Sequence, residues 1–240
     1  MSGHSKWSTI KRKKGLIDAE RGKVFQKLAK EIYVAAKGSD GDPSTNPSLR
    51  MIVDKAKAEN MPKDKIQAAI DKATKSASGE NYEFIRYEGY ASGGVAVMVD
   101  CLTDNRNRTA SLVRSTFTKR GGNLGTDGSV SYLFSKKGII LIDKKYDEDM
   151  IMGIALDNDA LDFSVSDDSY EIITDESNFT DMNNALEKEG VTEILMNEVR
   201  FIPSNYMKLD NEKSEKVLGL IEALEDLDDV TNVYHNLELD

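Results

Sequence analysis

The sequence predicts an α+β protein with an N-terminal three-helix domain and two α+β domains, the third of which is ferredoxin-like and inserted into the second. Three observations predict this architecture. Apolar residues recur at helical spacing as far as residue 75. After Gly79 the pattern changes to short runs of aromatic and branched residues, which are typical of strands. From residue 137 the expected elements follow the β-α-β-β-α-β order of ferredoxin-like domains, and one α-β pair remains beyond them.

The N-terminal domain is expected to contain three amphipathic helices. The first covers residues 20–37, where the apolar stripe includes Leu28 and Ile32. Asn46 and Pro47 supply an N-cap and a proline at the first position of a second helix, which ends near residue 60. Pro62 opens a third helix, and residues 76–79 form a linker. The first domain is therefore predicted to cover residues 1–76.

The middle domain is expected to begin with strands over residues 82–90 and 95–102, joined by a glycine turn. Asp104 or Asn105 then caps a helix with Val113 and Phe117 on its inner stripe. A glycine-rich turn covers residues 121–128, and a strand is expected over 130–134.

The inserted domain is expected to contain two helices and four strands. The strands cover 138–142, 162–166, 170–174 and 193–202, and the helices cover 148–156 and 180–189. A last helix containing Val217 and Leu224 and a strand at 230–237 then complete the middle domain. The predicted boundaries are 77–134 with 205–240 for the middle domain, and 135–204 for the insertion.

Charge is distributed unevenly along the chain. The net charge is −10, but residues 1–75 hold 17 Lys and Arg against 9 Asp and Glu, while residues 135–240 hold 9 against 27. A basic end on an acidic protein is typical of a surface that binds nucleic acid. A single cysteine, Cys101, forms no disulfide framework, and no apolar run reaches the roughly 20 residues that span a bilayer. We therefore expect a cytoplasmic protein without membrane contact.

The first fifteen residues carry five cations, one tryptophan and no acid. Cations of this kind neutralise phosphates and release counterions, and Trp7 is suited to stacking on an unpaired base. The alternative is a solvated tail with Trp7 folded back onto the helices. The first helix extends the basic surface, with Lys23, Lys27 and Lys30 on one face. The predicted nucleic-acid-binding residues of this part are Lys6, Trp7, Lys11, Arg12, Lys13, Lys14, Arg21, Lys23, Lys27 and Lys30.

Two loops of the middle domain form a second candidate site. Arg106 and Arg108 lie at a strand-to-helix junction, where free N–H groups and guanidiniums could hold a phosphate. Gly121, Gly122 and Asn123 follow the same helix and would permit close approach of a phosphate to the backbone. Ordinary helix capping and a tight turn explain both loops equally well.

Nothing in the sequence makes a positive case for an enzyme. His4 and His235 lie at opposite ends of the chain, and neither accompanies a nucleophile. Cys101 lies in an apolar strand, so we expect it in the core. The many carboxylates lack the spacing of a metal site, and no phosphate-binding loop of the NTPase type occurs. No catalytic residue, metal or cofactor is therefore predicted.

Six short motifs occur in order along the chain. They are Gly3-His4-Ser5-Lys6-Trp7, Arg21-Gly22-Lys23, Asn60-Met61-Pro62-Lys63-Asp64, Tyr87-Glu88-Gly89-Tyr90, Leu102-Thr103-Asp104-Asn105-Arg106-Asn107-Arg108-Thr109 and Gly121-Gly122-Asn123-Leu124-Gly125. Together they resemble the YebC family of transcriptional regulatory proteins, whose mitochondrial relatives act as translational activators. The resemblance covers essentially the whole chain. It implies three domains with the third inserted into the second, and a cytoplasmic, non-enzymatic factor associated with nucleic acid.

The expected function is that of a non-enzymatic regulator of gene expression that binds nucleic acid, with the acidic inserted domain turned away or in contact with a protein partner. The family resemblance favours DNA and transcription. The alternative is an RNA- or ribosome-associated translation factor, because no helix-turn-helix is evident and a basic arm with a tryptophan suits RNA. A third possibility, from another class, is a protein–protein adaptor whose charges orient docking.

Overall fold

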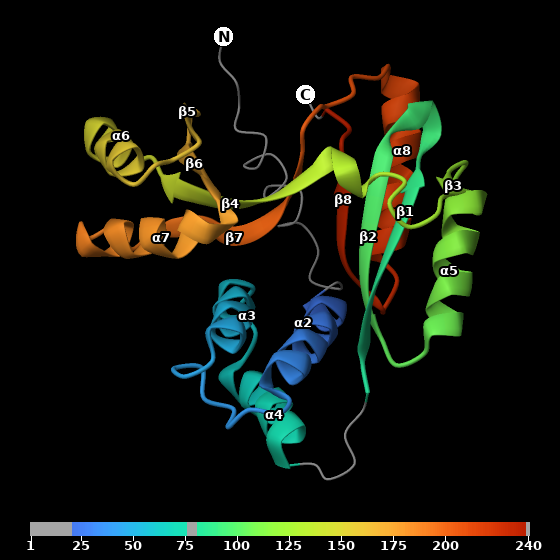
Figure 1. Cartoon of the computed structure of the whole chain (residues 1–240), viewed down its shortest axis with the longest axis horizontal. Coiled ribbons are helices and arrows are strands. Elements are labelled where there is room, and N and C mark those ends of the chain that lie inside the picture. The colour runs from blue at the N-terminus through green and yellow to red at the C-terminus, as the bar shows by residue number, and fades with distance from the viewer. Residues whose placement is uncertain (1–20, 76–80, 239–240) are drawn as a thin grey trace. The chain divides into compact units, whose positions relative to one another are not determined.

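The computed structural model describes residues 21–75 and 81–238 (Figure 1). The described chain forms two compact units. Leu133–Tyr206 belong to one of them, and the segment ending at Tyr132 forms the other together with Met207–Leu237. The chain therefore leaves the larger unit at Tyr132 and returns to it at Met207. The predicted α+β fold class, with a helical N-terminal part and an inserted third domain, is confirmed.

The helical part of the larger unit consists of α2 (Arg21–Ala36), α3 (Pro47–Ala58) and α4 (Lys63–Lys75). Leu28, Ile32 and Leu49 are almost wholly buried in its core. Asn46 begins α3 as predicted, because its side chain accepts a hydrogen bond from Leu49 N at 3.0 Å. The same side chain donates to Ala35 O at 2.8 Å, so it also joins the start of α3 to the last turn of α2.

The middle sheet has the strand order β3-β1-β2-β8. Its strands are β1 (Glu83–Tyr90), β2 (Ala96–Thr103), β3 (Asn123–Leu124) and β8 (Val230–His235). β2 pairs antiparallel with both β1 and β8, so the C-terminal strand completes the sheet begun by the first two. Every residue of β2 is buried, including Cys101, as predicted for a cysteine in an apolar strand. Burial raises the pKa of the Cys101 thiol to about 12, which leaves it protonated and unreactive.

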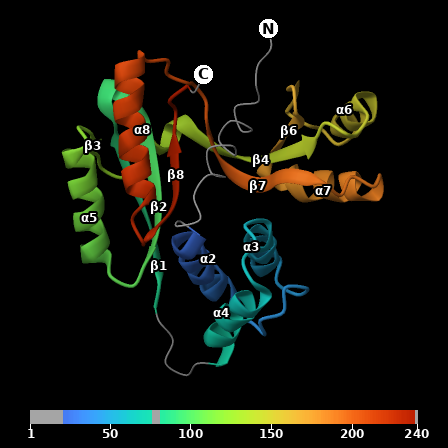
Figure 2. The same cartoon turned by 180° about the vertical axis from the view of Figure 1, so that it is seen from behind.

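The helices α5 (Arg106–Lys119) and α8 (Asn211–Glu225) pack together on the middle sheet (Figure 2). Val113 and Phe117 of α5 and Leu220 and Leu224 of α8 are fully buried there. The strand predicted over 130–134 is wrong. A short 3-10 turn covers Ser131–Leu133, and the following strand belongs to the other unit. Two backbone N–H groups of this segment, those of Val130 and Ser131, bond to the Glu88 carboxylate, which explains why the segment does not join the sheet.

The inserted unit contains β4 (Phe134–Asp143), α6 (Glu148–Asp157), β5 (Asp162–Val165), β6 (Ser169–Asp175), α7 (Phe179–Lys188) and β7 (Ile194–Pro203). Its sheet has the order β5-β6-β4-β7, and every pair is antiparallel, which is the ferredoxin-like arrangement. Ile140 and Ile142 of β4 pack against Ile151 of α6 and Met182 of α7. The strand predicted at 138–142 is part of the longer β4, which pairs with β7 from Phe134 to Ile142.

Candidate nucleic-acid interface

The basic arm predicted to bind nucleic acid lies outside the described residues. This applies to Lys6, Trp7, Lys11, Arg12, Lys13 and Lys14. Arg21 begins α2, but its side chain is also outside the described part. The roles of these residues remain predictions from the sequence.

The three lysines predicted on one face of the first helix do share a face, and they all meet the same turn of the chain. We call Lys23, Lys27 and Lys30 the α2 lysine stripe, and residues 225–229, which join α8 to β8, the α8–β8 turn. Lys23 Nζ lies 3.0 Å from Asp226 Oδ1, and Lys27 Nζ donates to the carbonyl oxygen of Glu225. Lys30 Nζ donates to Asp228 O and to Asp229 Oδ1, both at 3.0 Å.

The carboxylates and carbonyl groups of the α8–β8 turn determine the electrostatic environment of the α2 lysine stripe. Burial lowers the pKa of Lys27, while the nearby carboxylates of Glu225, Asp228 and Asp226 raise it, and the net shift is downward. The Glu225 carbonyl belongs to the last turn of α8, where the helix dipole favours a cation. The stripe is thus largely neutralised within the chain, rather than presenting three uncompensated charges.

Asp229 connects the α2 lysine stripe to the start of α5. Its side chain is 5% exposed and accepts hydrogen bonds from Lys30, from Arg108 Nη2 at 2.7 Å and from Thr109 Oγ1 at 2.8 Å. Burial works to raise the pKa of Asp229, but the bonds from Arg108, Thr109 and Lys30 outweigh it and hold the pKa at about 2. Asp229 is therefore ionised at neutral pH and joins three separate elements.

The predicted phosphate site at the start of α5 has helix-capping geometry. Asn105 Oδ1 accepts from Arg108 N at 3.1 Å and is the N-cap. Arg108 Nη2 is shared between Asp104 at 2.8 Å and Asp229. Arg106 is more open, with a side chain 67% exposed and 3.7 Å from Glu83. A phosphate at this junction would have to compete with two carboxylates for Arg108.

The glycine-rich loop ends α5 and packs tightly against the sheet. Gly121 has φ +74°, and Gly122 N donates to Phe117 O at 2.8 Å, which is the hydrogen-bond pattern of a helix closed by a left-handed residue. A Cβ at Gly122 would come within 2.9 Å of Tyr90 O. Asn123 pairs with Tyr90 in the sheet. These contacts give the loop a structural explanation without a phosphate.

Glu88, in the motif at the end of β1, holds the segment after this loop. Its carboxylate accepts from Gly128 N at 3.0 Å, Val130 N at 2.7 Å and Ser131 N at 2.8 Å. Burial raises the pKa of Glu88, but these three N–H groups more than compensate, so the pKa lies below its ordinary value. Glu88 is thus an ionised buried carboxylate with a structural role.

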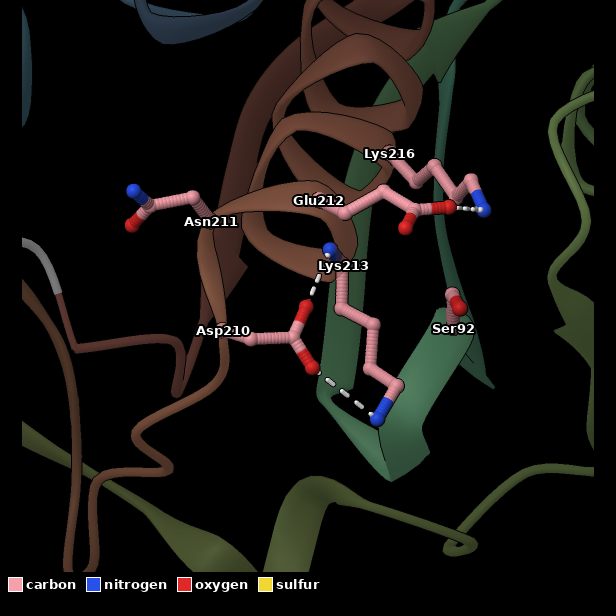
Figure 3. A pocket seen from close by; sticks show the side chains of 6 residues that line it. All are labelled: Ser92, Asp210, Asn211, Glu212, Lys213 and Lys216. Atoms are coloured by element: carbon pink, nitrogen blue, oxygen red, sulfur yellow. Dashed lines mark hydrogen bonds and ion pairs between the residues drawn. The ribbon is translucent and has the colours of Figure 1, made fainter.

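A pocket at the start of α8 offers no uncompensated charge (Figure 3). Its two lysines each point to an acid of the same helix turn. Lys213 Nζ lies 3.1 Å from Asp210, and Lys216 Nζ lies 2.7 Å from Glu212. Within the described residues, no cluster of His, Cys, Asp and Glu is arranged to hold a metal ion. In the same part of the chain, no helix is both long and apolar enough to cross a membrane.

Asp229 and Glu88 are two buried carboxylates whose structural roles sequence reasoning did not identify. Glu88 lies in a quoted motif, so the sequence pointed to its position but not to its partners. Asp229 ends the acidic stretch 225–229, and in the sequence nothing distinguishes its carboxylate from the solvent-exposed ones beside it. Only the fold distinguishes it, because its partners are more than 100 residues away along the chain.

Comparisons with known proteins agree with this architecture. The model of the TACO1/YebC N-terminal domain matches residues 5–76, and the model of the TACO1/YebC second and third domain matches residues 82–237. The chain is 54% identical over 239 residues to a "Probable transcriptional regulatory protein" of Geobacter sulfurreducens, covering 100% of this chain and 96% of that protein. It is 52% identical over 241 residues to a protein of the same description from Geobacillus kaustophilus, covering 99% and 98%.

A solved structure has the same fold. The crystal structure of a conserved hypothetical protein of Aquifex aeolicus superposes with a TM-score of 0.81 at 43% identity. The match covers 92% of this chain and 91% of that one. The two family models and the relatives that are more than 50% identical over nearly the full length indicate the same family. This chain belongs to the TACO1/YebC family.

Proposed function

We propose that this protein is a non-enzymatic regulator of gene expression that acts by binding nucleic acid. The observation that carries the proposal is the separation of charge, with 17 cations against 9 acids in residues 1–75 of a chain whose net charge is −10. A basic surface of this kind supplies strong, salt-dependent and largely sequence-independent affinity for phosphates. Because the curated relatives are described as probable transcriptional regulatory proteins, DNA is the first candidate polymer.

In this proposal the arm makes the first contact, because the α2 lysine stripe is already neutralised by the α8–β8 turn. Lys11 and Lys13 would bind phosphates, and Trp7 would stack on a base where the strands open. The stripe would add to the contact only when phosphates displace Asp226 from Lys23 and Asp229 from Lys30, which makes it the weaker part of the surface.

Translation is the second candidate, with RNA as the polymer. Trp7 between cations favours it, since unpaired bases stacked on aromatic side chains are the usual target of specific RNA recognition. Crosslinking in cells followed by sequencing of the bound polymer separates the two candidates. Ribosomal RNA fragments would select translation, and promoter DNA would select transcription.

Binding itself is tested by a salt series with the full chain. The affinity for a DNA duplex and for an RNA hairpin is measured by fluorescence anisotropy between about 50 and 200 mM salt, the range over which phosphate contacts weaken strongly. We expect affinity to fall with salt, with a smaller slope in Lys11→Ala and Lys13→Ala. Absence of binding to both polymers at low salt would contradict the proposal and favour a protein–protein adaptor.

A further inference from the structure

Helix α5 is the one described α-helix that contains no acidic residue. The fifteen residues from Arg106 to Arg120 contain five cations and no acid, although the whole chain has 42 acids in 240 residues. Four of the five are arginines, which bind phosphate in a forked, two-bond geometry. One complete helix of this acidic protein is therefore positively charged and free of acidic residues.

Three of the five cations, Arg108, Arg114 and Lys119, lie on the face of α5 that points away from the sheet. The buried face carries Thr109, Val113 and Phe117. Successive helical residues are rotated by about 100°, so the opposite face carries residues 107, 108, 111, 114, 115, 118 and 119. We call this the outer face of α5. Its members are Asn107, Arg108, Ser111, Arg114, Ser115, Thr118 and Lys119.

Two of these cations are not neutralised. Within the described part of the chain, Arg114 and Lys119 are exposed and have no acidic group within 4 Å. Other described helices pair some of their exposed lysines with acids one turn away. Examples are Lys57 with Asp54, Lys75 with Asp71, Lys213 with Asp210 and Lys216 with Glu212. Within the described residues, Arg50 of α3 and Lys188 of α7 are also exposed without an acidic partner, so what distinguishes α5 is that the helix itself carries no acid.

We propose that the outer face of α5 binds the phosphate backbone of a nucleic-acid duplex, as a contact surface separate from the basic arm. This inference rests on the proposed nucleic-acid binding and adds a second site to it. Arg114 and Lys119 are about 7.5 Å apart along the helix axis, which corresponds to about two phosphates of one strand. The Ser111 hydroxyl and the Asn107 amide lie on the same face and donate to phosphate oxygens.

The polar character of the face favours nucleic acid over an acidic protein. Protein interfaces usually contain a buried apolar or aromatic centre, whereas contacts to nucleic acid are more polar and positively charged. Leu112, at the edge of the outer face and 42% exposed, is the large apolar side chain exposed on described α5. The face lacks the apolar anchor that a protein partner would need.

The test compares two double variants of the full chain. Arg114→Gln with Lys119→Gln removes the unpaired charges, and Lys213→Gln with Lys216→Gln removes two exposed lysines that are already paired. Affinities for a 20-base-pair DNA duplex and the matching RNA duplex are measured across a salt series. We expect the α5 variant to bind at least one duplex roughly tenfold more weakly at about 100 mM salt and to lower the salt slope by about 2, one unit per lost phosphate contact. The α8 variant should change neither.

The outcomes separate this inference from the proposed function. If the unaltered protein binds neither duplex, nucleic-acid binding itself fails. If it binds and the α5 variant binds equally well while retaining its thermal unfolding midpoint, the outer face of α5 is not a contact. Equally effective competition by poly-glutamate at the same charge concentration would indicate an acidic protein as the partner and would also overturn the inference.

Discussion

The Nζ atom of Lys30 lies 3.0 Å from Oδ1 of Asp229, joining α2 to the turn that precedes the last strand. The two residues are 199 positions apart in the sequence. Asp229 uses its other oxygen to accept from Arg108 and Thr109 of α5. One buried carboxylate thus links the helical part, the α8–β8 turn and the start of the most basic helix of the middle domain.

Replacing Asp229 should destabilise the larger unit. Asp229→Asn removes the charge that Lys30 and Arg108 surround, and breaking a buried ion pair from one side costs about 3 kcal/mol. The free energy of unfolding, measured in urea, should fall by this amount. Asp228→Asn is the matched control, because the Asp228 side chain is exposed and its carbonyl, not its carboxylate, accepts from Lys30. Equal stability of the two variants would show that the carboxylate is not needed.

The same carboxylate predicts how stability depends on pH. The pKa of Asp229 is about 2 in the folded protein and is ordinarily 3.8. Its folded-state pKa is depressed, so the stabilisation is fully present above about pH 4 and is lost as pH falls toward 2. The shift is worth roughly 2 kcal/mol. The free energies of unfolding of the unaltered protein and of Asp229→Asn should therefore approach each other as the pH falls across this interval. A difference that stays constant would contradict the low pKa of Asp229.

Glu88 should control the order of the segment at 128–131. In Glu88→Gln, one of the two carboxylate oxygens becomes an NH₂ donor that faces backbone N–H groups, which leaves buried donors unsatisfied at a cost of about 2 kcal/mol. Hydrogen exchange at Val130 and Ser131 should accelerate in this variant. Glu83→Gln, at an exposed position of the same strand, should leave both rates unchanged. Unchanged protection in Glu88→Gln would mean that the carboxylate does not hold the segment.

The glycines near the end of α5 should differ in their tolerance of a side chain. A Cβ at Gly89 would lie 2.6 Å from Asn123 O and 3.2 Å from Leu124 Cα, so β3 would have to move. A Cβ at Gly121 meets nothing within 4 Å, and only its φ of +74° opposes alanine, at a cost of about 1 kcal/mol. Gly89→Ala should therefore lower the thermal unfolding midpoint more than Gly121→Ala does. The reverse order would contradict the close approach of β3.

Neutralising the α8–β8 turn should strengthen nucleic-acid binding. Glu225→Gln, Asp226→Asn and Asp228→Asn together remove carboxylates that oppose the α2 lysine stripe, so phosphates would meet less competition. We expect the affinity for a duplex to rise several-fold at low salt, because each exposed charge contributes up to about 1 kcal/mol. Neutralising Asp181 and Glu187 of α7 and its C-cap residue Glu189, all three of them exposed, controls for net charge. Equal gains in both triple variants would show that only net charge matters.

The sequence predicted the fold more completely than the site. Helical periodicity located α2 and α3, because each buries one regular face, and runs of aromatic and branched residues located β1, the fully buried β2 and the ferredoxin-like order. The strand predicted at 130–134 was wrong. Its apolar residues are typical of a strand, but the backbone N–H groups of Val130 and Ser131 bond to the Glu88 carboxylate rather than to a neighbouring strand.

The site was harder to predict because charge pairing over long sequence distances has no local pattern. Lys23, Lys27 and Lys30 were correctly placed on one face, but nothing in their spacing showed that the α8–β8 turn would occupy it. The sequence shows that α5 contains cations, but it does not show that two of them lie unpaired on one exposed surface. Only the fold shows that Arg114 and Lys119 face outward without acids nearby.

The most direct test of nucleic-acid binding through the basic surfaces is photo-crosslinking of the full chain to a DNA duplex and to an RNA hairpin, followed by mass spectrometry of the linked peptides. We predict crosslinks within residues 1–30 and 106–120, and none within the acidic unit Leu133–Tyr206. Crosslinks confined to Leu133–Tyr206, or none with either polymer, would contradict the assignment.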